Sequence, residues 1–158
     1  MLHDIGTIYI PNHILKKEGD LTDSEWEEVK KHTVIGEEII NMITSHHQSG
    51  LDDLKNIIGQ HHEWVNGKGY PRGLPAARLD FYTRATAVVD TYDAITSRRC
   101  YSDAQSSATA LRILYENRGT QFDERLVVQF IDCIGIYPPG VLVELNTGEV
   151  GVVLSVVR

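Results

Sequence analysis

The chain has 158 residues, of which 42% are hydrophobic and 23% charged, as in one globular domain with its own core. Its net charge of −7 argues against a nucleic-acid polymer as the main partner, but not against a small phosphorylated ligand, because bound cations can reverse the local field of an acidic protein. No apolar run is long enough to span a membrane, no signal-peptide pattern is present, and two cysteines make no disulfide framework, which together favour a reduced, cytoplasmic setting.

The first half of the chain predicts two helices after an opening that glycine and proline interrupt. Residues 1–20 contain Gly6, Pro11 and Gly19. Residues 22–25 form a capping box, in which Thr22 caps a helix start and Glu25 reaches back to it. Apolar residues then recur at roughly helical spacing: Trp26, Val29, Val34, Ile35, Ile39, Ile40 and Ile43. The next helix presents Leu51, Leu54, Ile57 and Ile58 on one face and leads into His61-His62.

The second half predicts three more helices and a terminal β-hairpin. Residues 66–73 are too rich in glycine and proline for regular structure and form a loop. Helices are expected over residues 82–98, 106–117 and 122–134. β-Branched residues in 141–145 and 150–157, with a turn at 146–148, predict a hairpin. The expected fold is mainly α, with a core over residues 1–136 and a C-terminal hairpin extension over residues 137–158.

Histidines and aspartates in adjacent pairs, together with one aspartate in an apolar segment, indicate a metal site. Asp90 follows the apolar run 85–89, and burying an unpartnered carboxylate costs on the order of several kcal/mol, a cost that metal coordination removes. Imidazole and carboxylate ligands suit iron, manganese, zinc or nickel. Ions about 3.5–4 Å apart can act together on a phosphodiester. The candidates are His3, Asp4, His32, His61, His62 and Asp90.

The spacing of these residues does not decide between a metal site and ordinary structural histidines. His-Asp and His-His pairs occur by chance, and a single histidine on a helix is usually a surface or core residue with a satisfied hydrogen bond. Three other histidines, His13, His46 and His47, are assigned to the surface. His46-His47 ends a predicted helix, where the helix dipole favours a protonated histidine without any metal.

Several short motifs follow one another along the chain, and their order is informative. His3-Asp4-Ile5-Gly6 is followed by His32, by His61-His62-Glu63 and by a loop with Gly69-Tyr70-Pro71. Residues 89–97 precede Arg99 and Tyr101, and Gly119 precedes Gln121-Phe122-Asp123. This order resembles the HD-GYP family over nearly the whole chain, including the segment from Tyr137 to the end.

The resemblance implies an HD-domain helical bundle with a centre of two or three divalent metal ions, iron or manganese. It implies hydrolysis of cyclic di-GMP, a bacterial second messenger, to the linear dinucleotide or to GMP, while some relatives prefer cyclic GMP-AMP. By motif position, the six candidate residues are metal ligands, and Asp4 and Asp90 bridge the ions of the catalytic centre. The resemblance also implies an upstream sensory or receiver domain and a homodimer.

The resemblance further assigns a substrate pocket. Tyr70 is expected to face the substrate, where it could stack on a guanine, with Asp93, Arg99 and Gly69 also in contact. A surface turn whose glycines only relieve strain is the alternative reading of the loop. Glu63 is expected to orient a ligand histidine through its second ring nitrogen.

The sequence departs from the HD-GYP pattern in three places. Thr7 stands where the family usually has a lysine, and Ser102 stands where a basic residue is common. The helix that precedes the His-Asp motif in the family, with its additional ligands, is not in this sequence. A centre short of a ligand and an exposed apolar groove would follow. Two other functions therefore stay open: a degenerate module that binds metal, nucleotide or protein with little hydrolysis, and an HD-superfamily hydrolase for another phosphorylated molecule.

Overall fold

The computed structural model describes residues 2–44, 51–97 and 104–155. The first half forms a 3-10 helix and three α-helices: η1 (Leu2–Tyr9), α1 (Asn12–Leu15), α2 (Asp23–Thr44) and α3 (Asp52–Gln60). The second half forms η2 (Ala76–Arg78), α4 (Phe81–Thr96), α5 (Ser107–Glu116), α6 (Glu124–Ile134), β1 (Leu142–Glu144) and β2 (Val150–Val152). The predicted mainly helical fold with a C-terminal hairpin is confirmed.

Helix starts follow the capping residues in the sequence. Thr22 and Glu25 make the predicted capping box, with Thr22 N donating to Glu25 Oε2 at 2.7 Å and Glu25 N donating to Thr22 Oγ1 at 3.3 Å. Helix α6 begins at Glu124 rather than at residue 122, because the Asp123 carboxylate accepts from the backbone N–H groups of Arg125 and Leu126 and so caps the helix. The side chain of Phe122 is thereby free to enter the core.

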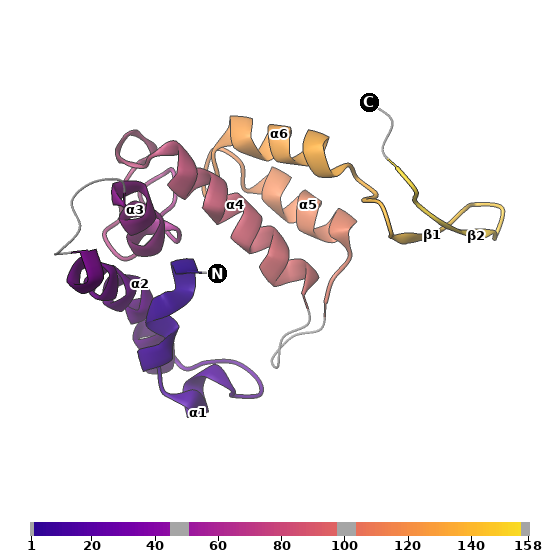
Figure 1. Cartoon of the computed structure of the whole chain (residues 1–158). Helices are drawn as coiled ribbons and strands as arrows, with labels where there is room; N and C mark the ends of the chain where they lie inside the picture. The colour runs from indigo at the N-terminus through magenta and orange to yellow at the C-terminus, as the bar shows by residue number, and fades with distance from the viewer. Residues whose placement is uncertain (1, 45–50, 98–103, 156–158) are drawn as a thin grey trace.

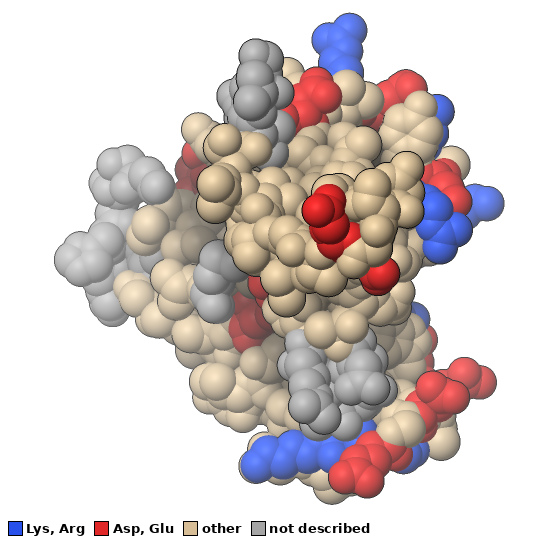
Figure 2. Space-filling view, turned by 90° about the vertical axis from the view of Figure 1, so that its right-hand side faces the viewer, with Lys and Arg blue, Asp and Glu red and all other residues tan. Residues whose placement is uncertain are grey.

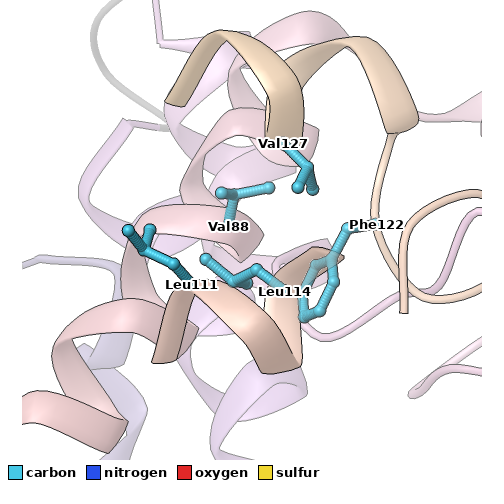
Figure 3. Close-up of a cluster of buried hydrophobic side chains, with 5 residues drawn as sticks. All are labelled: Val88, Leu111, Leu114, Phe122 and Val127. Carbon is cyan, nitrogen blue, oxygen red and sulfur yellow. The ribbon is translucent and has the colours of Figure 1, made fainter. Parts of the chain in front are cut away.

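Two groups of helices meet at α3 and α4 (Figure 1). In the first group η1, α2 and α3 pack against one another, and in the second α4, α5 and α6 do so. The core of the second group is a cluster of buried side chains, shown in Figure 3: Val88, Leu111, Leu114, Phe122 and Val127. This cluster anchors α4, so it also determines where Asp90 lies.

The C-terminal hairpin stands away from the helices (Figure 1). Its antiparallel strands pair Leu142 with Val152 and Glu144 with Val150. Both strands are shorter than predicted, and β2 ends at Val152. Because the hairpin lies outside the bundle in Figure 1, the division at residue 136 is compatible with the structure and stays a prediction.

On the face seen in Figure 2, the described Lys and Arg side chains, drawn in blue, lie mainly toward the margins. Among the described residues, no helix combines the length and apolar character needed to cross a membrane.

Candidate metal centre

Close backbone packing at two glycines brings η1, which carries His3-Asp4, against α2, and α2 against α3. A Cβ on Gly6 would lie 1.9 Å from the His32 carbonyl oxygen and 2.7 Å from Gly36 N, so only glycine permits this contact. A Cβ on Gly36 would lie 2.7 Å from a side-chain carbon of Ile58 on α3. Gly36 therefore permits the close packing of α2 on α3. Together the two glycines place His3-Asp4 against α2 and α3.

The six predicted ligands converge from four elements of the fold. Those atoms of Asp4, His32, His61 and His62 that could hold a metal lie within 4.8 Å of one another, and those of His3, Asp4 and Asp90 form a second group with the same limit. His3 and Asp4 come from η1, His32 from α2, His61 and His62 from the end of α3, and Asp90 from α4. Asp4 is the member common to both groups.

The ring nitrogens and carboxylate oxygens of the predicted ligands lie within a few ångströms of one another. His32 Nε2 and His61 Nε2 each lie 3.5 Å from Asp4 Oδ1, and 3.4 Å from one another. His3 Nε2 lies 3.0 Å from Asp4 Oδ2 and 3.4 Å from Asp90 Oδ1. His3 Nε2 is nevertheless buried without a hydrogen bond of acceptable geometry. A buried ring nitrogen that faces two carboxylates without a well-aligned hydrogen bond fits a site where all three groups could hold a cation.

Backbone carbonyls orient two of the predicted ligand histidines. His32 Nδ1 is 2.7 Å from the Val29 oxygen, and His61 Nδ1 is 3.0 Å from the Ile57 oxygen and 3.2 Å from the Ile58 oxygen. When Nδ1 carries the proton and donates it to these carbonyls, Nε2 keeps its lone pair toward the centre, as in most histidine metal sites. The residues present therefore fit a metal.

The electrostatics favour neutral imidazoles on one side of the centre. Burial lowers the pKa of His32, and burial, reinforced by His61 and His32, lowers the pKa of His62 to about 3. Both rings are therefore neutral near pH 7, with a lone pair available for coordination.

On the other side of the centre, His3 carries a proton beside Asp4 and Asp90, where a cation could bind instead. The carboxylate of Asp4, and next that of Asp90, raise the pKa of His3 to about 9. Burial raises the pKa of Asp4, but His3 and His61 outweigh it and hold that pKa well below its usual range. Burial also raises the pKa of Asp90, but His3 outweighs this effect, so the pKa of Asp90 is lowered. The carboxylates stay charged, and the Asp4 side chain, 45% exposed, leaves the centre open to solvent.

The Gly-Tyr-Pro loop lies beside the centre. The Tyr70 ring stacks on the His62 ring, with centroids 4.8 Å apart and planes at 21°. Burial raises the pKa of the Tyr70 phenol, which stays protonated. Gly69 packs closely against the backbone of Trp64, since a Cβ on Gly69 would lie 2.3 Å from Trp64 N.

The remaining predicted residues have different outcomes. Asp93 is exposed on α4, one turn beyond Asp90, and Arg99 and Ser102 lie outside the described residues, as do His46 and His47. His13 is exposed, as predicted. Thr7 Oγ1 donates to the Asp4 carbonyl at 2.7 Å. Leu2, Ile8 and Tyr9 of η1 are exposed apolar side chains.

The prediction for Glu63 was wrong. Its carboxylate does not orient a histidine; it accepts from the backbone N–H groups of Arg72 at 2.6 Å and Leu74 at 2.9 Å. The reason is geometric, because the helical carbonyls three and four residues earlier already occupy the Nδ1 atom of His61.

The sequence reading also missed two residues beside Tyr70. The Trp26 ring meets the Tyr70 ring edge to face, with centroids 6.1 Å apart. Lys30 Nζ lies over both rings, 5.9 Å from the Trp26 centroid and 5.7 Å from the Tyr70 centroid. Their spacing of four residues on a predicted helix was the available signal, since such residues share a face.

An all-helical domain with clustered imidazoles and carboxylates on converging helices defines a class of metal-binding proteins. The family model described as "HD domain" matches residues 1–126, and the chain belongs to this family. The resemblance to HD-GYP proteins is confirmed.

Several curated proteins are similar to the chain. It is 40% identical over 155 residues to a Pseudomonas aeruginosa protein named cyclic di-GMP phosphodiesterase PA4108, covering 98% of this chain and 36% of that protein. It is 39% identical to the Xanthomonas campestris cyclic di-GMP phosphodiesterase response regulator RpfG, covering 80% and 32%. It is 33% identical to 3'3'-cGAMP-specific phosphodiesterase 3 of Vibrio cholerae, covering 87% and 29%. The chain thus spans about a third of the length of these relatives.

A solved structure shares the fold. Bd1817, a HDG"Y"P protein from Bdellovibrio bacteriovorus, superposes with a TM-score of 0.63 at 21% identity, covering 83% of this chain and 40% of that one.

Proposed function

We propose that this chain is the catalytic core of a metal-dependent phosphodiesterase that hydrolyses cyclic di-GMP to linear pGpG, to GMP, or to both. The observation that carries the proposal is the position of Asp4, which belongs to two ligand groups at once beside the Tyr70 ring. The printed names of the similar curated proteins, which act on cyclic di-GMP or 3'3'-cGAMP, support the same substrate class.

The centre is proposed to hold two or three divalent ions, iron or manganese, because mixed nitrogen and oxygen ligands suit these metals. His3, Asp4, His32, His61, His62 and Asp90 are the proposed ligands, with Asp4 and Asp90 as bridges. When bound, the ions supply the positive charge and Lewis acidity with which water can attack phosphorus.

The protein's own groups bind and orient the substrate. Tyr70 presents a protonated phenol and an aromatic ring beside the ligand His62, so it can donate to a substrate oxygen or contact a guanine. We assign Gly69, Asp93 and Arg99 to the same pocket, with Arg99 as a planar donor to phosphate or a guanine edge.

We place this reaction in bacterial second-messenger signalling in the cytoplasm. The substrate is a small cyclic dinucleotide rather than a nucleic-acid polymer, in keeping with the net charge of −7. An upstream sensory or receiver domain as regulator and a homodimer as the working assembly complete the proposal.

A second candidate is a binding module with little hydrolysis. It is favoured by Thr7, whose hydroxyl is engaged with the Asp4 carbonyl and supplies no ammonium for a phosphate.

Metal analysis and a hydrolysis assay on one anaerobic preparation separate the two candidates. Wild-type protein is expected to carry stoichiometric iron or manganese and to convert cyclic di-GMP. His61→Ala removes a buried ligand and is expected to lower both metal content and turnover. His13→Ala, which changes an exposed histidine on α1 that belongs to neither ligand group, is the matched control and is expected to leave both unchanged. Stoichiometric metal without turnover would favour the binding module, and metal content unaffected by His61→Ala would contradict the proposed centre.

A further inference from the structure

Glu63 follows the ligand pair His61-His62 directly but belongs to a different part of the structure. It is buried, with 3% of its surface exposed. Each carboxylate oxygen accepts from one backbone N–H of the Gly-Tyr-Pro loop: Oε1 from Arg72 at 2.6 Å and Oε2 from Leu74 at 2.9 Å. Hydrogen bonds to an ionised acceptor are roughly twice as strong as neutral ones. Two of them on one buried side chain fix the loop relative to the end of α3.

The first part of the loop folds back onto the segment that follows α3. Tyr70 N donates to the His62 carbonyl at 3.1 Å. Gly69 lies so close to Trp64 N and the His62 carbonyl that no side chain fits between them. Tyr70 is thus held by its own N–H on one side and by the two Glu63 bonds, two and four residues later, on the other.

This arrangement determines where the Tyr70 ring lies. The ring stacks on His62 and meets Trp26 edge to face. The ligand histidine His61, by contrast, is oriented by the carbonyls of Ile57 and Ile58, which do not involve Glu63. Glu63 can therefore affect the substrate side of the site while the orientation of His61 is kept.

We propose that Glu63 is a positioning residue, which places Tyr70 over the metal centre for substrate binding by holding the Arg72 and Leu74 N–H groups. This inference rests on the proposed phosphodiesterase function. It differs from a purely structural role for Glu63, in which its loss would affect stability without acting through Tyr70.

Glu63→Gln is the test variant, because the amide has the same shape but can accept at only one oxygen and presents an NH2 group to the other N–H. Loss of a hydrogen bond to a charged group corresponds to about a tenfold effect or more. KM for cyclic di-GMP is expected to rise about tenfold with metal content unchanged. Amide hydrogen exchange in residues 67–74 is expected to accelerate, while exchange in α5 and α6 is unchanged.

A matched control changes the same loop from its other side. The Arg72 side chain pairs with Glu37, and Glu37→Gln breaks this partly exposed ion pair without touching the Glu63 bonds. Because such pairs contribute little, KM is expected to change less than about twofold. A second route to the same defect is Gly69→Ala, whose methyl group would clash with Trp64 N, the His62 carbonyl oxygen and the Glu63 backbone and so displace the loop, while the Glu63 side chain itself is unchanged. It is expected to reproduce the higher KM and faster exchange even if Glu63→Gln does not fold.

A double-mutant cycle with Tyr70→Ala decides whether Glu63 acts through Tyr70. Little further loss from Glu63→Gln in the Tyr70→Ala background supports the inference. Full additivity of the two losses, or loop exchange that Glu63→Gln leaves at the wild-type rate, overturns it. If metal-replete wild-type protein does not hydrolyse cyclic di-GMP, the proposed function fails. Binding of the intact dinucleotide by titration calorimetry, with the exchange measurement, then tests the positioning of Tyr70 in place of KM.

Discussion

Gly6→Ala is the sharpest test of how the fold assembles the centre. The added methyl group would lie 1.9 Å from the His32 carbonyl oxygen, 2.7 Å from Gly36 N and 2.8 Å from the His32 carbonyl carbon. All three are backbone atoms, two of them belonging to a ligand residue, so no side-chain rotation relieves the overlap. Either η1 moves away from α2, which separates Asp4 from His32, or the domain unfolds more easily.

The expected magnitude follows from the cost of overpacking, which is about 1–3 kcal/mol where side chains can adjust. Because backbone atoms must move here, the loss of unfolding free energy should be about 3 kcal/mol, at the upper end of that range. For a chain of this size that is a fall in Tm of roughly 6–12 °C. Asp4 and His32 share a ligand group, so the affinity for metal should fall in parallel.

Urea unfolding and metal titration of the metal-free protein measure the two effects separately. Gly151→Ala is the matched control, since a Cβ there meets nothing within 4 Å, and its effect should stay within about 0.5 kcal/mol. Wild-type stability together with wild-type metal affinity in Gly6→Ala would refute the argument that close backbone packing builds the centre.

Three further predictions concern protonation and the core. The pKa of His3 is raised from 6.5 to about 9. Its stabilising interaction with Asp4 and Asp90 is therefore complete below about pH 6.5 and is lost as the pH rises through about 9. Urea unfolding of the metal-free protein should show this decline in stability. For the same reason, metal binding near pH 7 should displace about one proton from His3. Calorimetry in buffers of different ionisation enthalpy measures this release, and its absence would show that His3 is not a ligand. Leu114→Ala should lower the unfolding free energy by about 2–5 kcal/mol, because Leu114 is fully buried in the second core, while metal content stays unchanged, since no ligand lies on α5.

Much of the helical architecture was predictable because it depends on local signals. The capping box at Thr22 and Glu25, and the apolar spacing of α3, need only neighbours in the chain. Boundaries were less accurate where a side chain had two competing roles. Phe122 counted as the start of a helix, but it enters the core and leaves Asp123 as the cap.

The environment of the site was less predictable because it depends on contacts between distant segments. Glu63 carries a carboxylate that could orient a histidine, yet its two oxygens accept hydrogen bonds from backbone N–H groups nine and eleven residues later. In the sequence, Trp26 and Lys30 look like ordinary residues of an amphipathic helix. Only in the folded structure does the loop bring Tyr70 beside them. Nothing in the local pattern of either segment specifies these partners.

Residue types and their order along the chain were enough to predict a metal site and its candidate ligands, because imidazole and carboxylate donors are properties of side chains. Which donors share an ion, and that Asp4 belongs to both groups, depends on the close approach of η1 to α2 at Gly6. The same is true of the loop that Glu63 holds. Distances between remote segments are set by packing, and packing is a property of the folded molecule as a whole.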